Sequence, residues 1–181
     1  MTDDDLMALM RSGDDDAFDV LFDRHYASVY GLACALLQDH DGARDVLQET
    51  FLSVLRNARR YHASGTFRPW LLRICRNRCL TLLETTRNRR RLLDTARTEL
   101  SAPMYPSAAR QVDTGDALRV VQAELHRLPE RQREAIVLHA IEGLRYREVA
   151  EVLGVPLNTV KTLIRRARLT LAQAVRGGTS P

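Results

Sequence analysis

Near the carboxyl end, polar and basic side chains recur on one face of a helix that is predicted to begin near Leu157. The apolar residues of this helix recur at i, i+4, i+7 and i+11 and leave the polar face opposite them. They are Val160, Ile164, Ala167 and Leu171. Asparagine and arginine can read base edges, while lysine, threonine and flanking arginines hold phosphates. The residues expected to contact duplex DNA are Asn158, Thr159, Lys161, Thr162, Arg165, Arg166 and Arg168. The alternative, a basic helix end stabilised by its own dipole, holds for at least one of the last three arginines.

The preceding segment supplies the first half of a helix-turn-helix. Over residues 146–165, Ala150 falls at the fifth position and Gly154 at the ninth. A small residue lets two helices cross closely, and glycine gives the tight turn its backbone freedom. The positions that must pack the two helices together are apolar: Val149, Leu153, Val155, Val160 and Leu163. An ordinary helical hairpin in a core is the alternative, but the agreement of all these positions favours a helix-turn-helix.

No set of side chains is spaced for catalysis. The five histidines are scattered, and no glycine-rich phosphate loop is present. Cys75 and Cys79 lie at i, i+4 and could share a metal or respond to oxidation, but no Cys or His pair completes a zinc site. We interpret both cysteines as small buried apolar residues. The sequence thus predicts no metal, no cofactor and no enzymatic activity.

Charge is strongly segregated along the chain, although the net charge is only +4. Residues 1–50 hold 12 acidic and 3 basic side chains, whereas residues 51–100 hold 12 basic and 3 acidic ones. Residues 125–181 are basic again, with 10 basic and 5 acidic side chains. Arginine, which forms bidentate contacts with phosphate and guanine, supplies 26 of the 27 basic residues. A GC-rich genome explains the preference for arginine over lysine but not the segregation, which predicts an anionic polymer as partner.

Composition and periodicity predict an all-α protein of two small domains. Hydrophobic residues make 45% of the chain and charged residues 28%, as in globular proteins. Helical periodicity dominates, and no stretch alternates over strand length. Helices are expected over about 16–38, 42–59, 67–91, 116–128 and 130–142, ahead of the helix-turn-helix. Asp41 is expected to cap the second of these helices, and Ile141 to face the core.

Residues 95–115 are predicted to form a flexible linker between the domains, which span residues 1–94 and 116–181. The segment contains two prolines and small residues and has no sustained apolar stripe. No apolar run is long enough to span a membrane, and the acidic amino terminus does not resemble a targeting segment. Three cysteines are too few for a disulfide scaffold. These features predict a cytoplasmic protein without membrane insertion.

Several motifs occur in the order found in bacterial sigma factors. Residues 45–52, DVLQETFL, resemble the D-x-x-Q-E-x-F signature of that family. Phe67-x-x-Trp70-Leu-x-x-Ile-x-x-Asn77, followed by residues 87–91, RNRRR, resembles the segment that comes next in the family. Residues 128–133, LPERQR, and the helix-turn-helix resemble its C-terminal domain. The short two-domain form is similar to the extracytoplasmic-function (ECF) group of the sigma-70 superfamily, with a region 2-like bundle and a region 4-like domain.

The resemblance implies a protein that joins core RNA polymerase, recognises the minus-35 and minus-10 promoter elements and helps to open the DNA. Residues expected to face the polymerase clamp are Asp45, Gln48 and Glu49, and a solvated polar face is the alternative for them. Residues expected at the minus-10 element are Tyr61, Arg73, Arg76, Asn77 and Arg78. Stacking on an aromatic ring and a basic groove can offset the cost of unstacking bases. Tyr61 is expected to be the exposed aromatic, and Phe67 and Trp70 to be core residues. The helix-turn-helix set would read minus-35 duplex.

The family also implies an anti-sigma factor that occludes both domains, and the linker is long enough to permit compact and extended arrangements of them. Leu163 and Thr81 stand where the family often carries Arg and Asp, and the loop after Tyr61 lacks the usual acidic residue, so promoter preference is expected to be unusual. Other hypotheses are a stand-alone helix-turn-helix regulator and an interaction protein that sequesters another regulator. The polymerase-binding segment, residues 45–52, favours a sigma factor over a regulator that binds DNA alone.

Overall fold

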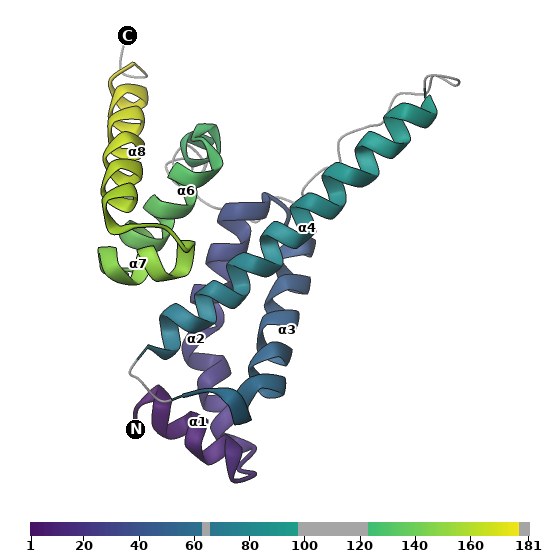
Figure 1. Ribbon diagram of the computed structural model, residues 1–181, viewed down its shortest axis with the longest axis vertical. Helices are drawn as coiled ribbons and strands as arrows, with labels where there is room; N and C mark the ends of the chain where they lie inside the picture. Colours follow the sequence, from purple (N-terminus) through teal and green to yellow (C-terminus); the bar gives the residue numbers. More distant parts are fainter. Residues whose placement is uncertain (63–65, 98–122, 178–181) are drawn as a thin grey trace.

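The computed structural model describes residues 1–62, 66–97 and 123–177, and within these ranges every regular element is helical. The first half comprises α1 (Asp3–Arg11), α2 (Asp16–Leu37), α3 (His40–Asn57), the short 3-10 helix η1 (Ala58–Arg60) and α4 (Phe67–Arg97). In the second half, residues 123–127 are helical and are followed by α6 (Glu130–Ile136), η2 (Val137–Ile141), α7 (Tyr146–Leu153) and α8 (Leu157–Gly177). Figure 1 shows α6, α7 and α8 beside the bundle that α1 to α4 form. The predicted all-α class is confirmed.

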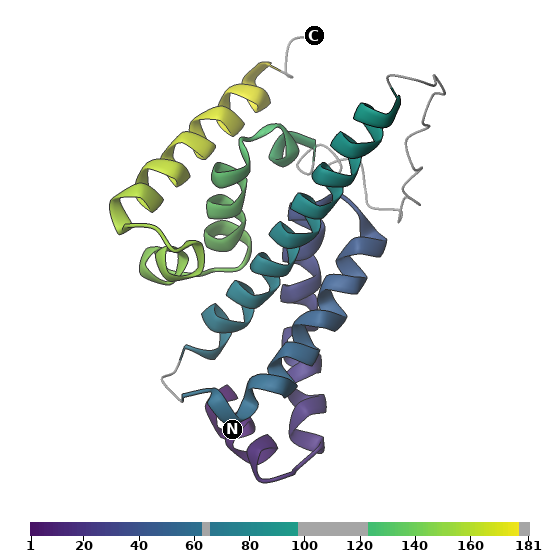
Figure 2. The same cartoon turned by 45° about the vertical axis from the view of Figure 1, so that its right-hand side comes forward.

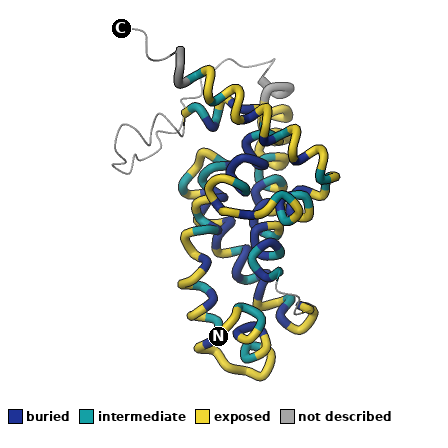
Figure 3. The backbone as a smooth tube through the Cα atoms, turned by 90° about the vertical axis from the view of Figure 1, so that its left-hand side faces the viewer, coloured by how far each residue is buried: buried dark blue, intermediate teal, exposed yellow. Residues whose placement is uncertain are grey.

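The first half is a bundle in which α2, α3 and α4 pack against one another, and α1 packs on α2 and η1. The apolar stripes that the sequence predicts supply its core, and buried residues run through the interior of the molecule (Figure 3). Fully enclosed side chains come from each long helix: Leu21, Val29 and Leu32 of α2, Val54 of α3, and Leu71, Leu72 and Cys75 of α4. Burying such stripes is the main source of helix stability in a bundle of this kind.

Helix boundaries agree with the sequence in the interior of the elements and differ at two ends. Asp39, rather than the expected Asp41, caps α3, because Asp39 has an extended backbone and its side chain accepts a hydrogen bond from the Asp41 amide at 3.1 Å. Asp41 already lies in the first turn. The helix α1 was not anticipated, although Thr2 and Asp5 form a reciprocal capping box at its start.

The helix α4 is longer than predicted and continues to Arg97, into the segment assigned to the linker. Residues 84–93 are exposed, and this part of α4 extends beyond α2 and α3 (Figures 1 and 2). The rest of the predicted linker, residues 98–115, lies outside the described residues. The same is true of most of the helix expected over 116–128, of which residues 123–127 are helical.

The second half contains the expected helix-turn-helix, with one difference in the helix before it. Gly154 ends α7 in the left-handed conformation at φ +65°, and α8 begins at Leu157 as predicted. Before them, η2 is a π-turn that adds a residue to the helical repeat. This insertion rotates the following side chains, so that Ile141 is 59% exposed while Val137 is buried. The expectation that Ile141 faces the core is therefore wrong.

Candidate nucleic-acid and polymerase interfaces

The helix α8 presents the expected duplex-contacting face to solvent. Val160, Ile164 and Ala167 are at most 1% exposed and anchor the helix on α6 and α7. All residues predicted to contact duplex DNA are exposed: Asn158, Thr159, Lys161, Thr162, Arg165, Arg166 and Arg168. Leu169 is 54% exposed and lies four residues after Arg165, so it shares this face, and the sequence analysis did not single it out. A basic helix of this kind fits a major groove.

The turn between η2 and α7 is fixed from both sides. His139 contacts the carbonyl oxygen of Leu144 through Nδ1 at 2.9 Å, and its ring packs edge-on against Tyr146 with centroids 4.7 Å apart. At the start of α7, Glu148 accepts hydrogen bonds from the backbone amide and side chain of Arg145. The Arg145 guanidinium lowers the pKa of the Glu148 carboxyl, with a further lowering from the backbone hydrogen bond. These contacts fix the start of α7, the first helix of the helix-turn-helix.

The predicted polymerase-binding residues lie on the outer side of α3. Asp45 and Gln48 are exposed and Glu49 is half-buried, with Arg56 of the next turns 3.9 Å from its carboxylate. The opposite side of the helix is enclosed at Val46, Leu47 and Thr50, and the Thr50 hydroxyl donates to the Val46 carbonyl at 2.7 Å. These three polar residues are therefore free of the core and available to a partner surface.

The residues predicted to contact the minus-10 element are not brought together as one cluster. Arg73 and Asn77 are exposed one turn apart on α4, so these two share a face. Arg78 points toward α3, where it donates to the Ser53 hydroxyl at 3.0 Å. Arg76 is only 6% exposed and is directed toward the second half of the chain.

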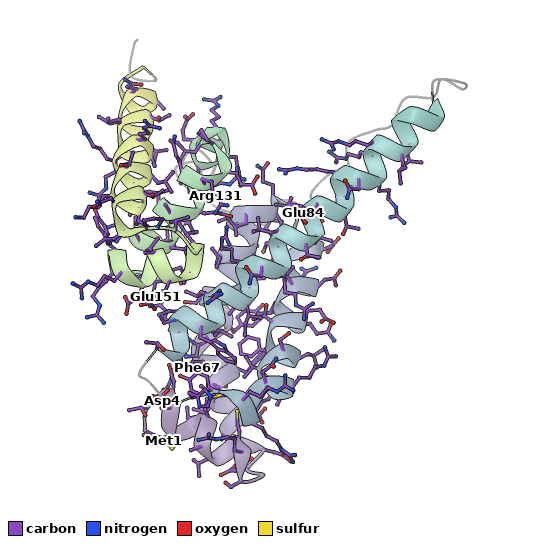
Figure 4. The ribbon with its side chains drawn as sticks, viewed as in Figure 1. Met1, Asp4, Phe67, Glu84, Arg131 and Glu151 are labelled. Atoms are coloured by element: carbon purple, nitrogen blue, oxygen red, sulfur yellow. The ribbon has the colours of Figure 1, made fainter. Side chains whose placement is uncertain are left out.

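Tyr61 is a core residue in this structure, and the expectation that it is exposed is wrong. It is 5% exposed, and its hydroxyl donates to Asp4 of α1 at 2.6 Å. Its ring packs on Phe67 and Trp70, with centroids 5.7 and 4.9 Å away. Burial and the Asp4 carboxylate together raise the pKa of Tyr61 far above its ordinary value. Asp4 and Phe67 are labelled at this end of the bundle in Figure 4.

Phe67 is 2% exposed, as expected of a core residue, and Trp70 is partly buried against the same cluster. The physical reason for the error at Tyr61 is α1, whose acidic first turn supplies a partner 57 residues away along the chain. The Thr2–Asp5 capping pattern was the one sequence signal that could have revealed this helix.

A polar junction joins α4 and α2 to the second half of the chain, and the sequence analysis did not find it. Arg76 donates to Glu134 at 3.1 Å, and Glu134 is 1% exposed. Glu142, at 5% exposed, accepts from Ser28 at 2.6 Å and from Arg68 at 2.9 Å. The partners are separated by 58 to 114 residues, so no local pattern could reveal them.

The cysteines are free thiols, and Cys75 and Cys79 are both fully buried, which confirms their assignment as apolar core residues. A hydrogen bond to Cys79 and burial raise the pKa of Cys75, which disfavours the reactive thiolate. Among the described residues, no cluster of His, Cys, Asp or Glu has the arrangement of a metal site. In the same part of the chain, no helix is both long and apolar enough to cross a bilayer.

Together, the exposed basic face of α8 and the bundle that precedes it define a two-part, helix-turn-helix DNA-binding protein. Family models agree with this division. Residues 21–92 match the model described as sigma-70 region 2, and residues 118–171 match the model described as sigma-70, region 4. The chain belongs to the ECF RNA polymerase sigma factors, whose members are transcription initiation factors.

The relatives are similar over nearly the whole chain. The ECF RNA polymerase sigma factor SigM of Mycobacterium tuberculosis (strain ATCC 25618 / H37Rv) is 37% identical over 177 residues, which cover 95% of this chain and 84% of SigM. The ECF RNA polymerase sigma-E factor of Haemophilus influenzae (strain ATCC 51907 / DSM 11121 / KW20 / Rd) is 31% identical over 175 residues, covering 93% and 92% of the two chains.

Solved structures share the fold. CnrH, in its complex with the cytosolic domain of CnrY, is 29% identical, with a TM-score of 0.72 over 98% of this chain and 99% of that one. The sigma factor RpoE from Bartonella quintana, in complex with the anti-sigma factor NepR, is 24% identical. Its TM-score is 0.69 over 88% of this chain and 96% of RpoE, and this likeness concerns the fold alone.

Proposed function

We propose that this ECF sigma factor binds core RNA polymerase through α3, recognises a minus-35 element through α8 and engages the minus-10 element through α4. The observation that carries the proposal is the exposure of the complete predicted face of α8 in a chain whose first half matches sigma region 2. A stand-alone regulator needs no region 2, so that alternative is not favoured. The protein acts as an initiation factor rather than as an enzyme, and in the cytoplasm, where RNA polymerase works.

The polymerase contact is assigned to Asp45, Gln48 and Glu49. Asp45 and Gln48 are exposed and Glu49 is half-buried on the side of α3 away from the core, which supports the assignment. Residues 1–50, which hold 12 acidic and 3 basic side chains, also suit a basic protein surface better than DNA.

The minus-10 contact is assigned to Arg73, Asn77 and Arg78, which are exposed on α4. Arg76 joins this set when its contact with Glu134 is broken. Tyr61 contributes by packing on Phe67 and Trp70 at the start of α4, rather than by stacking on a base.

The minus-35 contact is assigned to the exposed face of α8. Asn158 and Arg165 are placed to read base edges, because both side chains form bidentate pairs with bases. The remaining residues of that face hold phosphates: Thr159, Lys161, Thr162, Arg166 and Arg168. We also propose a protein partner of the anti-sigma kind, since CnrH, which is 29% identical, was solved in complex with the cytosolic domain of CnrY. We further propose two functional units, residues 1–94 and 116–181, joined by residues 95–115, of which residues 95–97 continue α4.

The polymerase assignment is tested by equilibrium binding of the full chain to core RNA polymerase. Gln48→Ala and Glu49→Gln are each expected to weaken binding by about 1–3 kcal/mol, the range for polar residues at the centre of an interface. Asp15→Asn is the matched control, because Asp15 is exposed and its side chain makes no capping hydrogen bond. Equal affinities for the variants and the control would contradict the assignment.

The DNA assignment is tested by binding of the full chain to minus-35 duplex at several salt concentrations. Arg165→Gln is expected to cost about 1–3 kcal/mol and to relax specificity at one base pair, whereas Arg168→Gln lowers the salt slope by about 1. Arg44→Gln is the control, since Arg44 is exposed on α3 and pairs only with the exposed Asp41 in the described structure. A loss for Arg44→Gln as large as that for Arg165→Gln would contradict the assignment.

A further inference from the structure

All three cysteines of the chain meet where α4 packs against α2 (Figures 1 and 2). Cys34 lies on α2, and Cys75 and Cys79 lie about one turn apart on α4. The thiols of Cys75 and Cys79 share a hydrogen bond. Cys79 also interacts electrostatically with Cys34 across the contact between the helices. Thiols from distant parts of the sequence therefore form one group, which we name the thiol cluster.

The register of α2 and α4 places the two helices in parallel beside this cluster. His25 of α2 packs on Phe67 at the start of α4, with ring centroids 5.2 Å apart. About one turn further along α2, the carbonyl oxygen of Val29 accepts a hydrogen bond from the Cys75 thiol at 3.5 Å. The two helices therefore run in the same direction here. About one further turn along each helix leads to the other two members of the thiol cluster.

Cys34 differs from the other two thiols in its exposure and in its neighbours. It is partly exposed, whereas Cys75 and Cys79 are fully buried. Its Sγ lies 3.6 Å from Nδ1 of His40, the first residue of α3, and the Tyr30 hydroxyl lies 3.1 Å from the same nitrogen. An imidazole at this position can accept the thiol proton, which is one way in which nucleophilic cysteines are activated.

The surroundings of Cys34 keep its thiol protonated until it reacts. Burial raises the pKa of Cys34, a hydrogen bond with Tyr30 lowers it, and the nearby Cys79 raises it again. The net effect is an increase, so little thiolate is present beforehand. A reaction at Cys34 therefore needs a base that removes the proton as the sulfur attacks, and His40 is placed to do so. Tyr30 stabilises the thiolate that forms.

We propose that Cys34 is an oxidation site, which reacts with hydrogen peroxide and then forms a disulfide with Cys79. In the first step His40 takes the thiol proton and the Cys34 sulfur attacks one peroxide oxygen. A sulfur–oxygen bond forms, the oxygen–oxygen bond breaks, and the departing hydroxide takes the proton from His40 and leaves as water. The sulfur loses two electrons, so the product is a sulfenic acid.

In the second step the Cys79 sulfur attacks the Cys34 sulfur. A disulfide bond forms, the sulfur–oxygen bond breaks, and the departing hydroxide takes the Cys79 proton to give a second water. In total, two thiols are oxidised to one disulfide and one peroxide is reduced to two waters. Cys75 remains a thiol, because it is fully buried and has no base comparable to His40 among its described contacts.

The site is tested by mapping the disulfide in the full chain. The reduced protein is treated with an equimolar amount of hydrogen peroxide, its remaining thiols are blocked with a maleimide, and it is digested with trypsin without reduction. Trypsin cleaves after arginine, so each cysteine falls in its own peptide, at residues 25–44, 74–76 and 79–87. Mass spectrometry is expected to find 25–44 joined to 79–87, with 74–76 carrying the maleimide. A bond between 74–76 and 79–87, or an unoxidised peptide 25–44, would overturn the proposal.

The order of the two steps is tested with cysteine variants whose folding is checked by circular dichroism. In Cys79→Ala the sulfenic acid has no partner thiol, and dimedone, a reagent for sulfenic acids, is expected to label Cys34. In Cys75→Ala, the matched control from the same helix, the disulfide is expected to form as in the native chain. Loss of the disulfide in Cys75→Ala, or no dimedone label on Cys34 in Cys79→Ala, would contradict the proposed order.

The role of His40 is tested by the rate at which Cys34 is oxidised. We expect His40→Ala to slow this rate by about tenfold, less than the about 10²–10⁴-fold of a base in an enzyme, because solvent also reaches Cys34. Added imidazole is expected to restore the rate, which it would not do if His40 served only to hold the fold. His62→Ala is the matched control, because His62 is exposed. Equal rates in the two variants, or no rescue by imidazole, would refute the role of His40. None of these measurements involves polymerase or DNA, so the outcome is independent of the proposed function.

Discussion

The hydrogen bond between Tyr61 and Asp4 distinguishes a structural role for Tyr61 from the stacking role that the sequence predicted. The change Tyr61→Phe removes only the hydroxyl and leaves the ring in its contacts with Phe67 and Trp70. A hydrogen bond to a charged group contributes about 1.5–3 kcal/mol, and the lower end applies here because Asp4 is partly exposed. We expect a loss of about 1.5 kcal/mol in the free energy of unfolding.

The assay is urea unfolding of the full chain, followed by circular dichroism, for Tyr61→Phe, Asp4→Asn and the double variant. If the two side chains act through their shared hydrogen bond, the losses are not additive, and a coupling energy of about 1 kcal/mol is expected for residues in direct contact. Additive losses, or a loss below about 0.5 kcal/mol for Tyr61→Phe, which is the range of surface substitutions, would refute the structural account of Tyr61.

Three further outcomes follow from burial and backbone geometry. Burial lowers the pKa of His25 below its ordinary value of 6.5, and contact with Asp3 only partly offsets this lowering. The folded state therefore favours the neutral imidazole, so the free energy of unfolding is highest above that value and declines as pH falls below it. The urea midpoint should drop between about pH 7.5 and about pH 5.5 for the native chain, and it should drop less for His25→Gln. Ile164→Ala, at a 1% exposed position, is expected to cost about 2–5 kcal/mol in urea unfolding, against less than about 0.5 kcal/mol for the 54% exposed Leu169→Ala. Gly154→Ala is expected to cost about 1–2 kcal/mol in the same measurement. The cost comes from the backbone, whose φ is +65°, and not from a clash, since no atom lies within 4 Å of an added Cβ. An unchanged midpoint would contradict the assigned turn geometry.

The sequence predicted what depends on local periodicity. The face of α8 follows from the spacing of Val160, Ile164 and Ala167, because helix period alone decides which side chains point away from the core. Gly154 likewise predicts the turn in which it lies, since few other residues adopt its backbone conformation without strain.

Features that depend on distant partners were missed. The sequence around Tyr61 predicts an exposed aromatic residue, because nothing local indicates that Asp4 of α1 contacts its hydroxyl. Arg76 cannot be distinguished in the sequence from the other basic residues of α4, and only the structure shows its ion pair with Glu134. The error at Ile141 has a different origin, because the apolar pattern was followed at a uniform helical period and the π-turn η2 breaks that period. Burial of a charged or polar side chain is a property of the assembled halves rather than of any local segment.

The most direct test of the central claim is run-off transcription by core RNA polymerase on fragmented DNA from the protein's own genome, with and without the full chain. We predict discrete new transcripts that require the chain and that weaken with Gln48→Ala and with Glu49→Ala. Polymerase that produces no new transcripts, while the chain alone protects specific duplex sites, would contradict the sigma-factor account.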